Sequence, residues 1–538
     1  MSTPNELFTA EEQDILSPYV TNTNRSVFVL TNLPEVIKGA LFSRYSRSKL
    51  GLRTLLLKEF IHKKESQFDQ IRGGDYHQNS SKNIELAIES AKNFYDRILD
   101  GYGDDSIGEL GGAHLALENI SILATKTIED SRIGGSPLEK STRYVSFSDK
   151  INGEYPFYKE PTLLKSAHRK LFLDTCVNLF DTYVLCTEPI RDHVRKCLPR
   201  DSNISQNAYE RSVRARGFDI IRGLLPAATV TNIGVFGNGR FFETLISKLK
   251  VDSLQELREI GQLSFEELNK VIPSFLRRAD TKHRHYQDFK SFNFSQKEFV
   301  SHIAFSQLGK LKPEQSDLVN LVDYDSEAEN KVIAALLYPY SSVSLQQIRE
   351  NVRNISDSEK FKLIKNAAGL REHRRHKPDR GLELAYYTFD ILGDYGMYRD
   401  LQRHRILSQA RQPLSTRFGY DTPYEIEDSG LGNQYHDAMA SAANAFEIIF
   451  KDFPLEAQYV VPMSYNIRWN ININLRALIW LTEIRSTPQG HAGYRRIAQE
   501  MFRKVKEVHP ALAEYMKFVD LSEYSLGRLN AEQRQENK

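Results

Sequence analysis

Three basic side chains stand together at Arg403, His404 and Arg405, and two hydroxyl residues followed by another arginine occupy 415–417. A guanidinium keeps its charge and donates paired hydrogen bonds to a phosphate or to the polar edge of a planar ring. A histidine between two arginines can donate, accept or carry charge near neutral pH. The run therefore suits an anionic or planar polar ligand, although a basic surface turn is the common interpretation of an isolated RHR tripeptide.

The residues before this run predict ordered elements that would aim it. The segment 387–392 (YTFDIL) is apolar and aromatic, as is typical of a strand. The segment 397–402 (MYRDLQ) has a helical pattern. Because the cations follow an ordered element, we expect their side chains to have a fixed direction.

Composition is that of an ordinary globular protein. Of 538 residues, 40% are hydrophobic and 26% charged, and 72 basic residues against 70 acidic ones leave a net charge of +2. No global field therefore draws the chain to nucleic acid or to an anionic membrane. The chain lacks an apolar run of about 18 residues, and its first 25 residues do not resemble a signal peptide. We expect a cytoplasmic protein with neither a nucleic-acid nor a membrane partner.

The three cysteines are Cys176, Cys186 and Cys197. They form no C-x-x-C pair, so the sequence indicates neither a disulfide framework nor a zinc site, and we expect no metal.

The basic run resembles the signature of a known family. RHRILS…STRF is similar to the pattern RHRxxSxNxxSxRY of flavin-dependent thymidylate synthases, and Glu383, the aromatic strand and the helix before it have the family's spacing. Residues 462–476 (PMSYNIRWNININLR), followed by Arg485, resemble the family's second cofactor and substrate segment. Together these motifs cover much of the second half of the chain.

The first half repeats the second. Glu109 and Glu383 correspond at an offset of 274 residues, and residues 141–143 and 415–417 (both STR) correspond at the same offset. Pro226 and Pro462 correspond at an offset of 236. Self-similarity of this kind marks a repeated unit. The offset falls by 38 because the first copy carries extra residues between Arg143 and Pro226. Residues 162–199 have an amphipathic helical pattern, and the polar, arginine-bearing stretch 201–217 is the candidate insertion.

Strand patterns at 27–30 and 318–322, each followed by a helix signal, extend the repeat to both N-terminal ends. We therefore predict an α+β fold made of two tandem copies of a flavin-dependent thymidylate synthase-like domain. The polar region 277–313 is the best boundary, which places the first copy at 1–300 and the second at 301–538.

The resemblance implies roles for residues of the second copy. Arg485 would be the catalytic residue that faces the uracil ring, favours ionisation at N3 and makes C5 nucleophilic, although a helix-surface arginine beside Glu483 is the alternative interpretation. The expected cofactor-binding residues are Arg403, His404, Arg405, Asn474, Arg476, Glu383 and, from the first copy, Ser106.

The first copy has lost flavin residues but keeps a substrate loop. It has Glu129-Asp130-Ser131 in place of the RHR run and Leu249 in place of Arg485. The substrate-binding residues that the resemblance implies are Glu139, Ser141, Arg143, Arg222, Ser415 and Arg417. Because the losses are complementary, we predict one composite site, with flavin cations from the second copy and loop residues from the first. The family is tetrameric, so a two-copy chain would need only a homodimer.

Two departures bear on the substrate. Asp400 stands where the family has a nucleotide-binding glutamine, and Gln458 stands where the first copy has Arg222, so we expect weaker binding of a nucleotide phosphate. The charge run 371–377 (REHRRHK) suits phosphate or nucleic acid, but a solvated loop is the favoured interpretation.

The resemblance implies methylation of deoxyuridine monophosphate (dUMP). Methylenetetrahydrofolate would be the carbon donor, NADPH the reductant and FAD the hydride carrier. A flavin-dependent modification of another pyrimidine nucleotide is the first alternative. A non-catalytic paralogue that binds nucleotide or folate is the second, and the intact RHR run and Arg485 argue against it.

Overall fold

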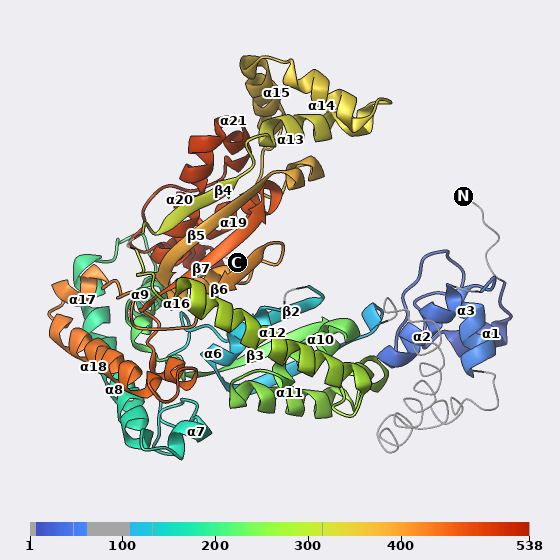
Figure 1. Ribbon diagram of the computed structural model, residues 1–538. Coiled ribbons are helices and arrows are strands. Elements are labelled where there is room, and N and C mark those ends of the chain that lie inside the picture. Colours follow the sequence, from blue (N-terminus) through green and yellow to red (C-terminus); the bar gives the residue numbers. More distant parts are fainter. Residues whose placement is uncertain (1–6, 47, 62–107, 132, 315, 537–538) are drawn as a thin grey trace. The chain divides into compact units, whose positions relative to one another are not determined.

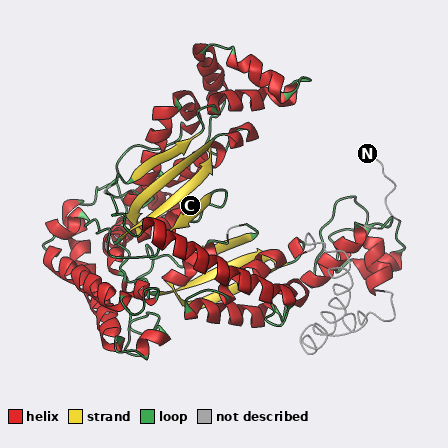
Figure 2. Ribbon diagram, viewed as in Figure 1, coloured by secondary structure: helices red, strands yellow, loops and turns green. Residues whose placement is uncertain are grey.

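The structure is a computed structural model that describes residues 7–46, 48–61, 108–131, 133–314 and 316–536. The chain divides into two compact units (Figures 1 and 2). Unit 1 comprises Met1–Glu118, Ser131–Glu139 and Asn232–Leu311, and unit 2 comprises Asn119–Asp130, Lys140–Thr231 and Lys312–Lys538. Unit 2 therefore combines nearly all of the second copy with a large part of the first.

Unit 2 is built on a four-stranded antiparallel sheet in the order β4-β5-β7-β6. The strands are β4 (Val319–Tyr324), β5 (Tyr386–Asp394), β6 (Ser408–Arg411) and β7 (Asn466–Asn474). The two central strands alternate, so that Phe389 of β5 and Trp469 of β7 point into the core. The strand predicted over 387–392 is confirmed, and α16 (Tyr395–Leu401) confirms the helix predicted after it.

Helices surround this sheet. The helices α19 (Leu475–Arg485) and α20 (Ala492–Val508) pack against β7 and β4 respectively. Further α-helices of the second copy are α13 (Ala328–Leu337), α14 (Leu345–Arg353), α15 (Asp357–Gly369), α17 (Tyr424–Asp428), α18 (Gly432–Phe450), α21 (Pro510–Ala513) and α22 (Leu529–Glu536). Capping boxes begin α14 at Ser344 and α15 at Ser356.

The first copy supplies long helices to unit 2. These are α8 (Arg169–Cys197) and α9 (Gln206–Ile221), preceded by the short α7 (Pro161–Leu164). The helix α8, with the short α7 before it, confirms the helical pattern predicted for 162–199. Cys176 and Cys186 are buried in α8, and Cys197 at its end is exposed.

The three-stranded sheet of the first copy has the order β1-β3-β2, with β1 (Gly112–Ser121), β2 (Gly135–Glu139) and β3 (Val230–Asn238). The strand predicted over 27–30 is wrong. Leu30 makes only an isolated bridge to Val20, and the side chains of Val27 and Val29 are largely exposed. These valines do not pack against another element, and β-branched residues favour a strand mainly through such packing. The helix predicted after them is present as α2 (Glu35–Tyr45).

The repeat predicted from sequence is visible in the structure. The strands β3 and β7 each have 9 residues and lead into helices, α10 (Gly239–Lys250) and α19, that are capped alike. Asn238 accepts a hydrogen bond from its third following amide at 2.8 Å, and Asn474 does the same at 2.9 Å. The α+β fold of two tandem copies is therefore confirmed.

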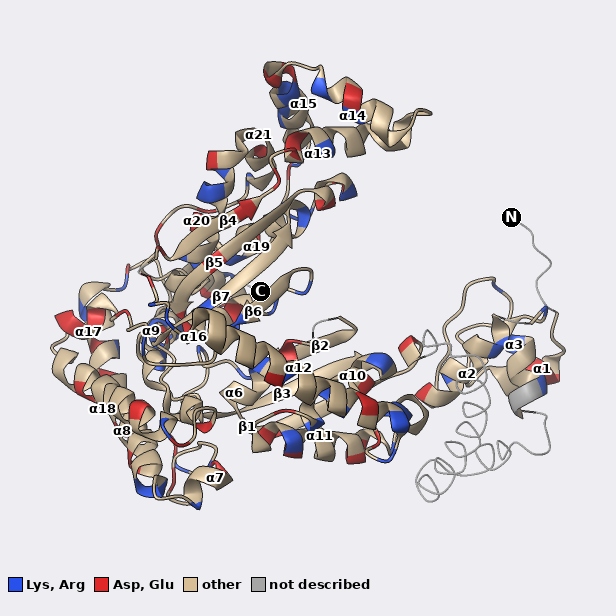
Figure 3. Cartoon of the chain, viewed as in Figure 1, with Lys and Arg blue, Asp and Glu red and all other residues tan. Residues whose placement is uncertain are grey.

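Residue 300, the predicted boundary between the copies, lies within α12 (Arg284–Leu308), and this boundary stays a prediction. Over the part of the chain that the structure describes, basic and acidic residues are interspersed (Figure 3). Within the described residues, no helix is long and apolar enough to cross a lipid bilayer.

Candidate functional site

A cavity of about 590 Å³ opens within unit 2 at the ends of β7 and α19. Volumes of this order are typical of small-molecule sites. The residues that line it are Arg371, Arg374, Lys377, Pro378, Glu383, Arg403, His404, Arg405, Ile406, Ile473, Asn474, Arg476, Ala477, Ile479, Trp480, Glu483, Ile484 and Arg485.

Seven residues that the sequence assigned to cofactor binding or catalysis line this one cavity. They come from four separate stretches of chain, and are Glu383, Arg403, His404, Arg405, Asn474, Arg476 and Arg485. Ser106, the remaining residue assigned to the cofactor, lies outside the described residues.

Local structure fixes the position of these side chains. Asn474 ends β7 and caps α19, so Arg476 falls in the first turn of that helix and Arg485 in its last. Arg476 donates to the Glu383 carboxylate at 2.8 Å and to the Pro378 carbonyl at 2.9 Å. These two bonds hold the Arg476 guanidinium at the wall of the cavity.

Arg485 and His404 form a hydrogen-bonded pair at the cavity. The Nε of Arg485 donates to Nε2 of His404 at 2.9 Å. Burial, and next the positive charge of Arg485, lower the pKa of His404 to about 3. The imidazole is therefore neutral at pH 7, and its proton lies on Nδ1. The guanidinium of Arg485 also lies 5.6 Å from the ring centroid of Tyr494, within cation–π range.

The charge run 371–377 is a loop in which five of seven residues are exposed, as interpreted from the sequence, but Arg371, Arg374 and Lys377 line the cavity. Arg371 is buried and donates two hydrogen bonds of 2.9 Å to the carboxylate of Glu483. Arg374 lies 5.9 Å from the ring of Trp480, whose side chain is 43% exposed. The sequence showed the charges, but it could not show a buried carboxylate 112 residues away.

The lining is strongly basic. Seven arginine and lysine side chains face two carboxylates, Glu383 and Glu483, and both carboxylates are hydrogen-bonded to arginines. Such a wall suits the phosphates of a nucleotide cofactor. The exposed indole of Trp480 offers a face on which a planar ring can stack. The donor set and the volume thus fit a flavin nucleotide.

A second group of charges joins the two copies within unit 2. Arg143 from the first copy binds the Asp219 carboxylate in a bidentate manner at 2.6 and 2.7 Å. It also donates to the Tyr494 hydroxyl at 3.2 Å and to the Gln489 carbonyl at 3.3 Å. Burial alone would raise the pKa of Asp219, but the charge of Arg143 outweighs it and keeps that pKa well below its usual value.

Arg222 from the first copy pairs with Asp400 from the second, at 3.2 and 3.3 Å. Burial would raise the pKa of Asp400, but Arg222 and the more distant Arg143 and Arg403 hold it well below its usual value. The sequence predicts that the Asp400 carboxylate weakens the binding of a nucleotide phosphate, and this stays a prediction. The structure adds that Asp400 neutralises the charge of Arg222.

The other residues predicted to bind substrate are not among those that line the cavity. Ser141 accepts a hydrogen bond from the Arg143 amide at 3.2 Å, and Glu139 is buried at the end of β2 in unit 1. Ser415 is half-buried. Arg417 pairs with Glu447 at 2.9 Å and lies over the ring of Phe450 at 4.3 Å.

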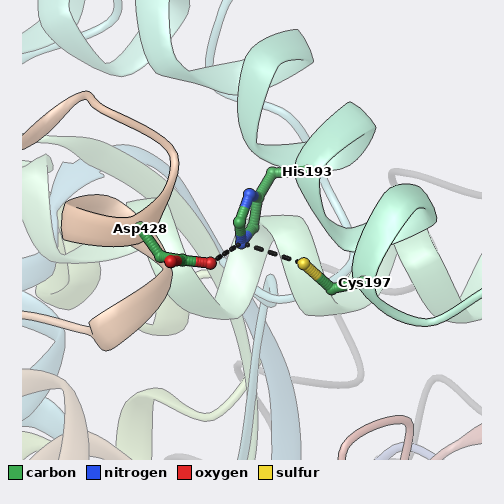
Figure 4. A group of neighbouring side chains, drawn as sticks. All are labelled: His193, Cys197 and Asp428. Atoms are coloured by element: carbon green, nitrogen blue, oxygen red, sulfur yellow. Dashed lines mark hydrogen bonds and ion pairs between the residues drawn. The ribbon is translucent and has the colours of Figure 1, made fainter.

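His193 and Cys197 on α8 and Asp428 on α17 point toward one another (Figure 4). The Nε2 of His193 lies 3.4 Å from the Cys197 sulfur and 3.3 Å from a carboxylate oxygen of Asp428. The three ligand atoms lie within 4.8 Å of one another, and Cys197 and Asp428 are exposed.

Comparison with known proteins supplies the family. A family model described as thymidylate synthase complementing protein matches residues 62–274 and 320–511. A UPF0159 protein of Chlamydia muridarum is 48% identical over 98% of both chains, and one of Thermoplasma acidophilum is 34% identical over 93% of this chain and 99% of its own. A flavin-dependent thymidylate synthase of Geobacter sulfurreducens is 27% identical over 36% of this chain and 84% of its own.

Proposed function

The chain belongs to the thymidylate synthase complementing protein family, and from that premise we propose that it is a flavin-dependent thymidylate synthase. It would convert dUMP to deoxythymidine monophosphate by reductive methylation. One observation carries the proposal. All the described residues that the sequence assigned to flavin or to catalysis line a single basic cavity, although they come from separate parts of the chain.

In this proposal, residues of the second copy bind and orient. Arg403 and Arg405 would hold the polar edge of the flavin and any phosphate beside it, because fixed cations stabilise negative charge without reorganising. FAD, when bound, supplies hydride transfer, with NADPH as its reductant and methylenetetrahydrofolate as the carbon donor. Trp480 and the apolar side chains of α19 would exclude water from the ring.

Arg485 would act on the pyrimidine. Its guanidinium favours negative charge at N3 of uracil, which raises the electron density at C5, where the methyl group is added. Neutral His404 accepts a hydrogen bond from Nε of Arg485 and so would orient the remaining N–H groups of Arg485 toward the ligand. Because His404 carries no charge, it does not compete with Arg485 for negative charge on the substrate.

The contacts of Arg143 with Tyr494 and of Arg222 with Asp400 support a composite site. The second copy would supply the flavin cations and Arg485, and the first copy would supply the arginines at the nucleotide. A homodimer of the chain would rebuild a four-copy assembly.

A second candidate function also has support. Arg143 and Arg222, the expected nucleotide contacts, are each neutralised by a carboxylate of this chain. Because these two arginines already have counter-charges, they would attract the phosphate of dUMP less strongly. The substrate of a flavin-dependent modification would then be a different pyrimidine nucleotide.

The visible spectrum of the purified protein tests the proposal. We expect bound flavin whose absorption shifts on addition of dUMP, is bleached by NADPH, and recovers with formation of deoxythymidine monophosphate when methylenetetrahydrofolate is added. Flavin that responds only to another pyrimidine nucleotide would favour the second candidate. A protein that binds no flavin would leave a non-catalytic binding protein.

A further inference from the structure

A second, smaller cavity of about 30 Å³ lies within unit 2 beside Arg143. This volume holds one or two water molecules or one small anionic group. Four arginines line it with a single carboxylate, Asp219, and these arginines are Arg143, Arg216, Arg495 and Arg528.

Three of these four arginines already have strong partners. Arg143 is bound to Asp219, and Arg216 forms an ion pair with Glu425. Arg495 donates to two backbone carbonyls at 2.8 Å each and lies 3.9 Å from a carboxylate oxygen of Asp520. Their charges are compensated within the fold.

Arg528 differs from the other three. Arg528 is only 6% exposed. None of the three nitrogens of its guanidinium donates a hydrogen bond to any part of the chain that the structure describes. Its guanidinium carbon lies 4.2 Å from the ring centroid of Tyr144. That contact uses the face of the guanidinium and leaves the in-plane N–H groups, five in an arginine, without acceptors.

Arg528 is held in place by its surroundings. It precedes α22, and the amides of Ala531 and Glu532 donate to its carbonyl at 2.8 and 3.0 Å. Arg211 of α9 then fixes α22 through ion pairs of 2.7 Å to Glu532 and 2.8 Å to Glu536. A buried, positioned cation without a hydrogen-bond acceptor is costly, and a bound anion is one way in which a native fold satisfies such a group.

We propose that the cavity beside Arg528 binds a phosphate group. A phosphate oxygen offers acceptors in the plane of the guanidinium, where Arg528 has none, and tetrahedral oxyanions match the planar fork of arginine. The proposal rests on the proposed function in one respect: it identifies the phosphate with that of the nucleotide substrate. A free inorganic phosphate would supply the same chemistry.

The nucleotide is the favoured source because one side chain connects this cavity with the cavity at Arg485. Arg143 and Arg485 each lie 5.6 Å from the ring centroid of Tyr494. Their guanidinium carbons are therefore at most twice that distance apart, within the span of one nucleoside monophosphate. Arg528 would then add an uncompensated cation at the phosphate, beside Arg143, whose own charge is neutralised by Asp219. It lies beyond residue 511, where the family match ends.

Calorimetric titration of the full-length protein tests the proposal. The ligands are dUMP, deoxyuridine and inorganic phosphate, in phosphate-free buffer at constant ionic strength. The test variant is Arg528→Met, and the control is Arg534→Met, at an exposed position of α22. We expect Arg528→Met to weaken dUMP binding about 10- to 100-fold, the range for a lost charge-assisted pair, and to leave deoxyuridine unchanged.

The arms of the experiment separate the sources. Loss confined to dUMP identifies the substrate phosphate, and loss confined to inorganic phosphate identifies a free anion site; both support the phosphate cavity. Equal binding of dUMP and phosphate by wild type and Arg528→Met overturns it.

Thermal unfolding and flavin content distinguish loss of the anion site from damage to the fold. Without phosphate, Arg528→Met should be at least as stable as wild type, because an uncompensated buried charge has been removed. An Arg528→Met protein that melts well below wild type in phosphate-free buffer would contradict the proposal. The flavin content of Arg528→Met should equal that of wild type. If the protein proves not to be a thymidylate synthase, inorganic phosphate should still raise the melting temperature of wild type, so the two proposals can fail separately.

Discussion

Pro226 and Pro462, which occupy equivalent positions in the two copies, face each other across an antiparallel bridge. Four backbone hydrogen bonds surround this bridge. They form two pairs. Within each pair, the donor and acceptor of one bond are the residues equivalent to the donor and acceptor of the other bond in the opposite copy, as two-fold symmetry requires. The pairs are Ala227 to Val461 at 2.9 Å with Met463 to Leu225 at 3.0 Å, and Ala228 to Tyr459 at 2.9 Å with Ser464 to Gly223 at 3.0 Å.

The first prediction concerns this contact between the copies. A Cβ added to Gly223 would lie 1.9 Å from Oγ of Ser464 and 3.1 Å from the Tyr435 hydroxyl. We expect Gly223→Ala to lower the free energy of unfolding by about 1–3 kcal/mol, as overpacking does. Urea unfolding measures this loss, and Ser464→Gly in the same chain should recover part of it. Gly369→Ala is the control, since its Cβ would meet nothing within 4 Å. Equal stability of the two single variants would contradict the prediction.

The second prediction concerns Arg485. Replacing it with glutamine removes a cation that is proposed to act mainly as charge develops on the pyrimidine. We expect kcat to fall about 10²- to 10³-fold while flavin content is retained. Steady-state formation of deoxythymidine monophosphate and the flavin spectrum provide the two readings. Arg496→Gln, at an exposed position of α20, should leave both unchanged. A rise in KM with constant kcat would mean that Arg485 only binds substrate.

The third prediction concerns the ion pair of Arg222 and Asp400. Asp400→Asn leaves the Arg222 guanidinium, of which 5% is exposed, without its carboxylate. We expect a loss of about 3–5 kcal/mol in the free energy of unfolding. Arg222→Met combined with Asp400→Asn should be more stable than the sum of the single effects, because the two residues couple. A double-mutant cycle by urea unfolding measures the coupling, and strict additivity would show that the pair contributes nothing.

The sequence identified most of the functional residues that line the cavity, but it did not reveal which charged residues pair with one another. Short-range motifs identified Arg403, Asn474 and Arg485, because each lies at or just after the end of a strand or helix, and the sequence pattern of that element is local. The pairing of Asp400 with Arg222 joins residues 178 positions apart, and no local pattern reports it. The strand expected at 27–30 failed for a related reason: β-branched residues form a strand only where another element covers one face.

The role of Arg528 in the small cavity could not be predicted from the sequence either. Arg528 stands near a polar C-terminal segment, residue 530 onward, whose composition by itself indicates no packing partner. The helix α22 instead packs on α9 through the ion pairs of Arg211. A polar segment of this kind is ordered by charges on a distant helix, so its own composition does not reveal the order.

The fourth prediction concerns pH. His491 donates from Nε2 to the Asp219 carbonyl at 3.2 Å and accepts at Nδ1 from the Gly493 amide at 3.1 Å. Burial, and next the charge of Arg222, lower its pKa from 6.5 to about 3, and the pKa of His404 is lowered to the same value. Between pH 6.5 and 3 the unfolded chain therefore binds protons that the folded chain does not, and stability falls as pH falls through this window.

Well inside that window each of the two histidines should contribute about 1 kcal/mol of lost stability per pH unit. Urea unfolding at pH 7.5, 6 and 5 gives the slope for wild type and for His491→Gln, which keeps a polar side chain but cannot titrate. We expect the variant to lose less stability than wild type between pH 6 and 5. His302→Gln, at an exposed position of α12, should leave the slope unchanged. If His491→Gln and wild type have the same slope, the imidazole must take up its proton in the folded protein, and its two backbone hydrogen bonds do not hold it neutral.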